Sequence, residues 1–437
     1  MNLTTAHHDG PVDQQSSEKL ARRGLELRRM SNELEEFEPW FQAVSRGFLD
    51  AEPTDVQRDA THERFNYRRL IGVIDSTGVM PEVPVGTFAS WMSAVSLPGE
   101  HVVTTCAISD VTVAPTHRRR GIARAMMEGE LRRAAAVGIP MATLTVTESN
   151  IYGRYGFAPA ATAGRWIIDA KRASWIGPDY PGRLDFISRA DWRERAPEIF
   201  ERVRPGRPGE AKMPGGYWDR FAGTRPDVEK PGKRRAVQYT DTEGVVRGVA
   251  LYAITENKED FTKSHLEILS LISDDDEAHG ALWRFFIDHD LIGEIRMDEG
   301  GIDDPVLWMI SDQKAAKVTL FDHHYLRILD LAVVLASRTY ATPGRFVLDI
   351  SDPLDITGGR WMLDIDASGA AEVSPAPADV PVGVTQARMG IGELGAIMAG
   401  QVSAATLAAA GRIETTDAVA LARAFSWHEQ ARLSFVY

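Results

Sequence analysis

The chain has 437 residues, a length that corresponds to two to four domains. Hydrophobic residues make up 44% of the sequence and charged residues 25%, the balance of an ordinary globular protein. The formal net charge of −13 argues against a bulk electrostatic affinity for nucleic acid or anionic lipid, although it leaves a local basic patch open.

The single cysteine, Cys106, excludes an internal disulfide and a thiolate metal cluster, which fits a reducing compartment. No apolar run approaches about 18 residues, so no membrane span is predicted. The polar start of the chain lacks the apolar stretch of a secretory signal, and residues 1–22 are expected to form a mobile tail. We therefore expect a cytoplasmic protein, with export without a recognisable signal left open.

Apolar spacing and turn residues predict an α/β unit in the first part of the chain. The expected elements are a helix over Leu25–Phe48, strands over Ile71–Ile74, Val85–Val95 and Val102–Val113, a helix over Ile122–Val137 that Gly138 ends, and a strand over Met141–Val146.

Changes of pattern near residues 180 and 326 predict two further segments. The second carries strands over Val249–Ile254 and Leu266–Leu269 and a helix over Ala278–Asp288. The third begins with two alternating strands, Arg345–Ile350 and Arg360–Ile365, which read as a hairpin around Gly358 and Gly359. Its alanine-rich end is predicted to be helical over Ile391–Met398, Ser403–Ala410 and Asp417–Phe425.

The sharpest local signal is an Arg-x-x-Gly-x-Ala pattern formed by Arg118, Gly121 and Ala123 between a strand and a helix. Such a junction leaves free backbone N–H groups at the positive end of a helix dipole, where small residues let a pyrophosphate approach. The residues alone leave two interpretations open, a phosphate site and a solvated basic turn. A nucleic-acid site is less favoured, because no aromatic stacking set surrounds the arginines.

The run VAPTHRRRGIARAM, followed by TESNIYGRYGFAPA at residues 147–160, resembles the Eis (enhanced intracellular survival) family of the GNAT superfamily of N-acetyltransferases. The segments DEAHGALWRFF, DHHYLRILD and GRFVLDISDP resemble later parts of that family, so that the resemblance covers residues 25–437. It implies an α/β (α+β) fold with tandem GNAT domains and a sterol-carrier-protein-like domain, assembled as a homo-oligomer, a hexamer. It also implies acetyl-CoA as co-substrate and a cationic amine as acceptor.

On this resemblance the chain divides into a tail and three domains. Residues 23–180 form the GNAT domain with the acetyl-CoA site, residues 181–325 a second GNAT-like domain, and residues 326–437 the domain that supplies the catalytic C-terminus. The second domain is expected to bind no acetyl-CoA, because the carboxylates of residues 274–277 at its helix start would repel pyrophosphate.

Matching positions assign the cofactor contacts. Three strand residues pair with the pantetheine arm, the helix start donates N–H groups to the pyrophosphate, and two residues after the next strand flank the other side. The strand residues are Val111, Thr112 and Val113. The residues at the helix start are Arg119, Arg120, Gly121, Ile122, Ala123 and Arg124. The residues after the next strand are Thr147 and Glu148.

The resemblance places Tyr152 in the position of the general acid. A phenol with a reference pKa of about 10 is protonated at neutral pH and can protonate a departing thiolate. Without the resemblance, a buried aromatic residue beside Tyr155 and Phe157 is the favoured interpretation of Tyr152.

The second catalytic group of the family is the main-chain carboxylate of the last residue, here Tyr437. With a reference pKa of about 3.3–3.7 it is ionised at neutral pH and can accept a proton from an attacking amine. The apolar run before it, Leu433–Val436, would let the segment enter the protein, whereas most termini are exposed.

No metal site is expected, because the histidines show no ligand spacing and His323 and His324 would point in opposite directions on a strand. An aromatic and methionine set can belong either to the core or to the acceptor pocket: Trp40, Phe41, Phe48, Phe88, Trp91 and Met92.

The sequence thus predicts an acetyl-CoA-dependent N-acetyltransferase acting on primary amines of a cationic small molecule, with aminoglycosides as the acceptors that the resemblance suggests. Protein lysine side chains are the nearest alternative acceptor. A non-catalytic protein that binds CoA or lipid is the alternative from another class.

Overall fold

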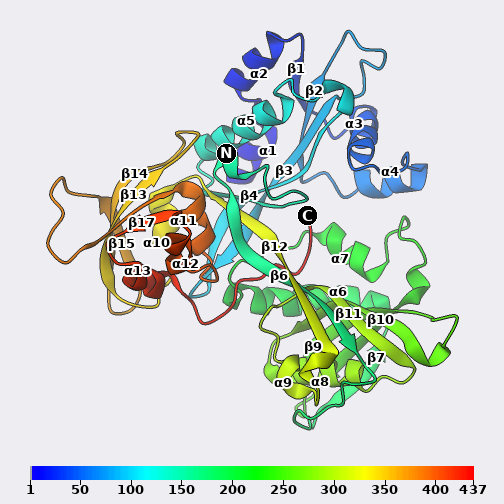
Figure 1. Ribbon diagram of the computed structural model, residues 1–437. Coiled ribbons are helices and arrows are strands. Elements are labelled where there is room, and N and C mark those ends of the chain that lie inside the picture. Colours follow the sequence, from blue (N-terminus) through cyan, green and yellow to red (C-terminus); the bar gives the residue numbers. More distant parts are fainter. Residues whose placement is uncertain (1) are drawn as a thin grey trace. The chain divides into compact units, whose positions relative to one another are not determined.

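The computed structural model describes residues 2–437 (Figure 1). Contacts among these residues divide the chain into two compact units. Unit 1 contains the described residues through Ala161, together with His323–Ala431 and Val436–Tyr437, and unit 2 contains Thr162–Asp322 and Arg432–Phe435. The chain passes between the units within β6 (Ala158–Asp169), within β12 (Ala316–Ile328) and near the C-terminus.

The first part of unit 1 is built on a mixed sheet with the strand order β1-β2-β3-β4-β5-β12. Neighbouring strands are antiparallel except for the parallel pair β4–β5, which α5 connects. The other strands and the helices of this part are β1 (Glu26–Met30), β2 (Arg69–Ile74), β3 (Gly86–Leu97), β4 (His101–Val113), β5 (Met141–Thr145), α1 (Leu3–Asp9), α2 (Gln14–Ala21), α3 (Leu34–Gly47), α4 (Asp55–His62) and α5 (Ile122–Val137).

Unit 2 repeats this topology with the strand order β6-β11-β10-β9-β8-β7, in which β10–β11 is the parallel pair and α8 connects its strands. Its elements are β7 (Arg183–Ile187), β8 (Arg234–Thr240), β9 (Val246–Thr255), β10 (Ser264–Ser273), β11 (Ile292–Gly300), α6 (Arg189–Val203), α7 (Gly215–Ala222), α8 (Asp276–Ile287) and α9 (Val306–Met309). The sixth strand in each order is one that passes between the units: β12 begins in unit 2 and ends in unit 1, and β6 begins in unit 1 and ends in unit 2.

The remainder of unit 1 is a five-stranded sheet of order β15-β14-β13-β16-β17 with helices packed against it. The predicted hairpin is confirmed, since Arg345 lies opposite Asp364 and Ile350 opposite Gly359. The elements are β13 (Gly344–Ser351), β14 (Gly359–Ile365), β15 (Ala371–Pro375), β16 (Thr385–Gly390), β17 (Ile413–Thr415), α10 (Leu331–Ala336), α11 (Ile391–Ile397), α12 (Ala404–Ala409) and α13 (Ala418–Phe425).

The prediction of a mobile tail over residues 1–22 is wrong where the structure describes it; residue 1 lies outside the described residues. Two helices form, and His7 and Leu20 are buried. The buried guanidinium of Arg69 donates to main-chain oxygens of His8, Gly10 and Pro11. The polar tail is thus held by basic side chains that are distant in sequence, which no local pattern indicates.

The predicted helix over Leu25–Phe48 is also only partly correct. Residues 26–30 form the edge strand β1, paired with β2, and the helix begins at Leu34. Within the strand Leu27 and Met30 are buried, where they serve the core of the sheet. Among residues 2–437 no helix is long and apolar enough to cross a membrane.

Candidate active site

The helix start predicted to bind pyrophosphate has an open geometry. Gly121 precedes α5 in the left-handed conformation, with φ of 75°, and no side chain caps the helix. Arg119 also adopts positive φ, 61°, so the turn exposes successive N–H groups. The described residues place no acidic side chain in the first turn of α5, which leaves its positive dipole end uncompensated.

The arginines around this turn divide into two groups. Arg120 lies 3.6 Å from Asp75 and donates to the main-chain oxygen of Arg23, and Arg124 pairs with Glu128 at 2.5 Å. Arg118 and Arg119 are exposed and form no ion pair among residues 2–437. Their positive charges are therefore available at the same turn.

The parallel strands β4 and β5 separate beside this turn. They pair only from Thr105 to Ile108 on β4. Thr112 and Val113 pair on one edge with β3, and Val111 follows Asp110, which has a φ of 54° at a break in the β3–β4 register. The three predicted pantetheine contacts thus lie where β4 is not paired with β5. This arrangement suits an extended ligand arm bound between two diverging strands.

The two residues predicted to flank the cofactor, Thr147 and Glu148, are exposed and lie just beyond the end of β5 at Thr145. Thr145 itself was not predicted as a site residue.

Tyr152 and Tyr155 occupy different environments. Tyr155 is buried in the core, and its main-chain oxygen accepts from the buried Arg327 at 2.8 Å. Tyr152 is half-buried, and its ring packs edge-on against Phe157 at 6.3 Å between centroids. Burial raises the pKa of Tyr152 above its usual value, and the neighbouring Tyr155 and Glu148 add to this effect. Tyr152 is therefore a phenol that stays protonated at neutral pH and is still partly accessible.

The last residue, Tyr437, is held against the end of β5. The hydroxyl of Thr145 lies 2.6 Å from the main-chain oxygen of Tyr437, to which it donates, and 3.3 Å from its nitrogen. The Tyr437 hydroxyl lies 2.6 Å from Nε2 of the buried His324. The apolar run before this residue is buried only in part, since Leu433 and Phe435 are each 1% exposed but Val436 is 53% exposed.

One member of the aromatic set reaches this residue. Trp91 packs edge-on against Tyr437 at 5.5 Å between centroids, and the guanidinium of Arg68 lies 4.4 Å from the Trp91 ring centre. Trp40 and Phe88 are instead core residues. Sequence reasoning left these roles open and missed both Thr145 and His324. A histidine directly before the apolar residues Tyr325 and Leu326 in β12 was the one signal available for His324.

A second feature missed by sequence reasoning holds the C-terminal segment within unit 2. Glu210 is fully buried, and its carboxylate accepts from the Ser434 amide at 3.1 Å and from the Ser434 hydroxyl. The Arg432 amide donates to the main-chain oxygen of Pro208 at 2.9 Å. Burial raises the pKa of Glu210, while its bonds to Ser434 oppose that shift.

The equivalent helix start in unit 2 is closed by its own side chains. Asp275 caps α8 by accepting from the Ala278 amide at 2.7 Å, and Asp276 and Glu277 occupy its first turn. Glu277 also accepts from the Tyr239 hydroxyl at 2.5 Å. Here a carboxylate occupies one N–H group of the helix start, and two further acidic side chains lie in the first turn, whereas α5 has neither feature. Within residues 2–437, no group of three or more His, Cys, Asp or Glu side chains could hold a metal ion.

Comparison with known proteins gives matches along most of the chain. A family model of the GNAT acetyltransferase domain matches residues 26–160, another matches residues 210–328, and a sterol carrier protein domain model matches residues 331–434.

The relatives include proteins described as N-acetyltransferases. An uncharacterised N-acetyltransferase of Streptomyces avermitilis is 33% identical over 86% of this chain and 89% of its own length. The N-acetyltransferase Eis of Mycobacterium tuberculosis is 33% identical over 80% of this chain and 85% of its own length. The crystal structure of Eis1 from Mycobacterium abscessus superimposes with a TM-score of 0.80 at 24% identity, covering 94% of this chain and all of that one.

Proposed function

Since the chain belongs to the Eis family of GNAT N-acetyltransferases, with two GNAT domains followed by a sterol carrier protein domain, we propose that it acetylates primary amines of cationic small molecules, using Tyr152 as acid and the C-terminal carboxylate of Tyr437 as base. The observation that supports this most directly is the hydrogen bond between the Tyr437 main chain and Thr145, at the strand end beside the diverging β4 and β5.

Acetyl-CoA is the co-substrate of GNAT acetyltransferases. We propose that the main chain of Val111–Val113 holds its pantetheine arm and that the N–H groups of residues 119–124 bind its pyrophosphate. The open N-terminus of α5, the left-handed Gly121 and the exposed Arg118 and Arg119 support this assignment. Thr147 and Glu148 would flank the other side of the cofactor.

In the proposed reaction the neutral amine attacks the thioester carbonyl, and the C–N bond forms as the C–S bond breaks. The nitrogen loses its proton to the Tyr437 carboxylate. The sulfur leaves as thiolate and takes the Tyr152 phenolic proton. A phenol with a raised pKa is the weaker acid in the ground state, yet it is fully protonated at neutral pH, as this role requires.

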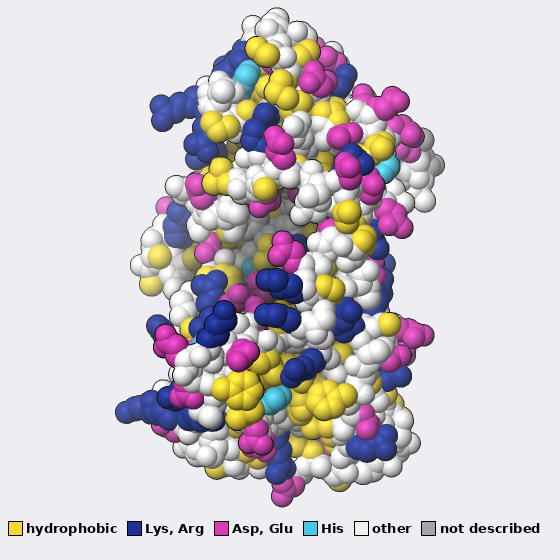
Figure 2. Space-filling view, turned by 90° about the vertical axis from the view of Figure 1, so that its right-hand side faces the viewer, with side chains coloured by type: hydrophobic (Ala, Val, Ile, Leu, Met, Phe, Trp, Pro, Cys, Tyr) yellow, Lys and Arg dark blue, Asp and Glu magenta, His cyan; other side chains and the backbone are white. Residues whose placement is uncertain are grey.

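Aminoglycosides are the proposed acceptors, modified at one or more amines. The net charge of −13 is compatible with capture of a polycation. On the face shown in Figure 2, basic and acidic side chains are interspersed, a distribution that does not favour a nucleic-acid surface. A protein lysine is the competing acceptor.

We further propose a homohexamer located in the cytoplasm. Light scattering of the purified chain should give six times its mass of 48.2 kDa.

The test is release of CoA thiol from acetyl-CoA with aminoglycosides, polyamines and a lysine peptide as acceptors. Tyr152→Phe should lower kcat about 100-fold, the lower range for loss of an acid catalyst. Tyr155→Phe is the matched control. It makes the same change, loss of one phenolic hydroxyl, at a buried core tyrosine three residues further along the chain. Adding one glycine after Tyr437 moves the carboxylate by about 3.5 Å and should lower kcat to a similar degree.

Each outcome decides a part of the proposal. Equal activity of Tyr152→Phe and the wild type would remove Tyr152 as the acid. Full activity of the extended chain would remove Tyr437 as the base. Turnover with the lysine peptide alone would replace the small-molecule acceptor.

A further inference from the structure

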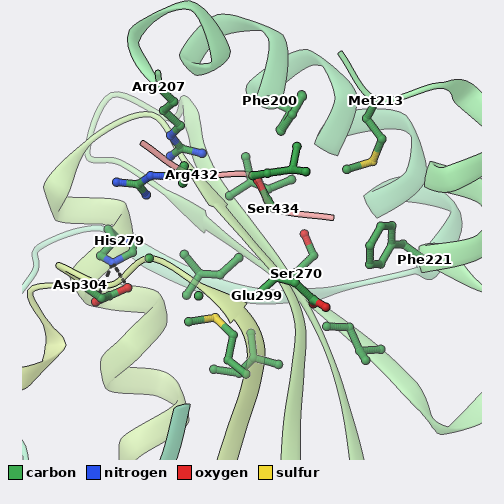
Figure 3. Close-up of a pocket in the computed structure, with 18 residues that line it drawn as sticks. Phe200, Arg207, Met213, Phe221, Ser270, His279, Glu299, Asp304, Arg432 and Ser434 are labelled. Atoms are coloured by element: carbon green, nitrogen blue, oxygen red, sulfur yellow. Dashed lines mark hydrogen bonds and ion pairs between the residues drawn. The ribbon is translucent and has the colours of Figure 1, made fainter. Parts of the chain in front are cut away.

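Unit 2 contains a cavity of about 70 Å³ between the strands of its parallel pair (Figure 3). Strands β10 and β11 pair from Ser264 to Glu267 on β10 and then separate. The space between them is lined by residues 268–272 of β10 and by Met297, Glu299 and Gly300 of β11, and Arg432–Ser434 of the C-terminal segment lines it as well. The divergence that suits a ligand arm in unit 1 is thus retained in unit 2, although the helix start there is closed by Asp275.

Two guanidinium groups lie at one end of this cavity, those of Arg207 and Arg432 (Figure 3). Arg207 donates to the main-chain oxygen of Ser273 at 3.1 Å. Nε of Arg432 is buried and has no hydrogen-bond partner within residues 2–437. A buried N–H without an acceptor is unfavourable, so this donor is available to a ligand in the cavity.

The acidic side chains nearby do not satisfy this donor. Asp303 lies 3.9 Å from Arg432 and is partly exposed, which makes a weak ion pair. Glu210 accepts from Ser434. The oxygens of Asp304 lie 3.2 Å from His279, and they also accept from the Trp283 side chain and the Val306 amide.

Glu299 is the remaining acid on the cavity wall. Burial, reinforced by the neighbouring Asp298, raises its pKa. A carboxyl group with a raised pKa opposes a bound anion less than an ordinary carboxylate and can donate to it when protonated.

The opposite end of the cavity is apolar. Figure 3 shows Met213 and Phe221 on the side away from the two arginines, with Phe200 above the space between them. A ligand that fits this space therefore carries an anionic group at one end and a short apolar part at the other. The volume is about half that of the 150 Å³ cavity that accommodates benzene, so the apolar part is short.

We propose that this cavity is a binding site for a small carboxylate of two to four carbons, whose oxygens accept from Arg432 and Arg207 and whose carbon chain packs toward Met213 and Phe221. The cavity is lined by residues of unit 2, whereas the residues of the proposed acetyl-CoA site belong to unit 1.

Such a ligand would brace the C-terminal segment. Arg432 and Ser434 form part of the wall, and Ser434 is held on its other side by Glu210. The segment then continues for three residues to Tyr437. A carboxylate bound to Arg432 adds a second attachment for this segment, so occupancy of the cavity and retention of the C-terminus in place are coupled.

The test is calorimetric titration of the full chain with sodium propionate, with sodium chloride of matched ionic strength as reference and no acetyl-CoA present. We expect saturable binding of one propionate per chain. Arg432→Gln should weaken it at least about tenfold, as for loss of a hydrogen bond to a charged group. Arg423→Gln removes an exposed arginine of α13 in unit 1 and should leave it unchanged.

Because Arg432→Gln could also disturb the fold, Ser270→Leu provides a second variant that fills the cavity from β10. It should abolish binding while Arg423→Gln retains it. Heat no greater than with chloride, or equal binding by Arg432→Gln and the wild type, would overturn the site.

The bracing is tested by the rate at which carboxypeptidase releases Tyr437. At about ten times the dissociation constant, propionate should slow release by up to about tenfold in the wild type, and not in Arg432→Gln. Binding without protection would overturn the bracing. Neither measurement depends on acetyl transfer, so failure of the proposed catalytic roles would not affect them.

Discussion

At the residue scale, the environment of Tyr152 determines how activity should depend on pH. A general acid acts in its protonated form, so activity falls as pH rises through its pKa. Burial raises the pKa of Tyr152, and we therefore expect the alkaline loss of kcat to lie above the usual tyrosine range near 10. The measurement is kcat against pH at saturating acetyl-CoA. In Tyr152→Phe the residual activity should lack this alkaline limb.

Glu148 is not needed for that prediction, because burial is the larger cause of the raised pKa of Tyr152 and Glu148 is exposed. Glu148→Gln should move the alkaline limb slightly toward lower pH, since a negative neighbour raises the pKa of a phenol. An alkaline limb that Tyr152→Phe retains unchanged would assign the titration to another group.

Glu210 is expected to act on catalysis through Ser434, as a positioning residue. Glu210→Ala leaves the Ser434 amide and hydroxyl without their acceptor and should loosen the segment that leads to Tyr437. A loss of about tenfold in kcat is expected, with KM for acetyl-CoA unchanged, as for loss of bonds to a charged acceptor. Glu210→Gln keeps one acceptor oxygen and should recover most of the activity.

Stability should separate this role from a general structural one. The pKa of Glu210 is raised in the folded state, so the folded protein favours its protonated form more than the unfolded chain does. The contribution of Glu210 to stability is therefore greatest below its unfolded pKa and is lost as pH rises through the folded pKa. Glu210→Gln should consequently be at least as stable as wild type at neutral pH in thermal unfolding. Marked destabilisation there would contradict this assignment.

At the element scale, the two ends of α5 provide a matched pair of glycines. Gly121 and Gly138 both adopt positive φ, at 75° and 93°. Alanine at either position should cost about 1–2 kcal/mol of stability, because left-handed backbone is unfavourable for residues with a Cβ. At Gly121 the added Cβ would also lie 3.1 Å from the Arg23 guanidinium, on the turn proposed to hold pyrophosphate.

Gly121→Ala should therefore raise KM for acetyl-CoA about tenfold with a smaller effect on kcat, whereas Gly138→Ala should lose stability alone. At Gly138 the nearest atom to a Cβ is the Leu3 Cδ2, 4.0 Å away. Parallel melting curves and acetyl-CoA titrations of both variants give the comparison. Equal values of KM in the two variants would refute the role of the turn.

Elements with local signals were predictable from sequence, and those with distant partners were not. The helix Ile122–Val137 forms with the predicted bounds, because its apolar spacing and the glycine after it are both local features. The strand Glu26–Met30 was predicted as helix because its assignment depends on pairing with β2, about forty residues later. The N-terminal helices were missed because Arg69 and Arg132 bind them from far along the chain.

At the scale of the whole molecule, folding brings distant segments together, and only part of the candidate site could therefore be predicted from the sequence. The helix start with Gly121 is a local motif, and Tyr152 was identified by resemblance alone. Thr145, His324 and Glu210 belong to segments whose proximity to the C-terminus arises only on folding. The strand arrangement shared by the two units was expected only through the resemblance, which implied tandem GNAT domains.

That repeated topology raises the question of how many acetyl-CoA molecules a chain binds. Both parallel strand pairs diverge, but only one helix start is open: α5 has no side-chain cap and no acidic residue in its first turn, while α8 is capped by Asp275 and carries Asp276 and Glu277. Carboxylates at a helix N-terminus satisfy its N–H groups and repel a pyrophosphate. We therefore expect one acetyl-CoA per chain in equilibrium dialysis.

The stoichiometry has an internal control in the two helix starts. Gly121→Ala should weaken acetyl-CoA binding at the single site. Asp275→Asn removes one charge from the start of α8 but retains an acceptor for the Ala278 amide. It should not create a second acetyl-CoA site, because Asp276 and Glu277 remain. Two acetyl-CoA molecules per wild-type chain would show that the carboxylates of α8 do not exclude the cofactor. One molecule lost in the Gly121 variant would place binding at α5, so that the duplicated fold keeps its strand divergence in both units and its cofactor chemistry in one.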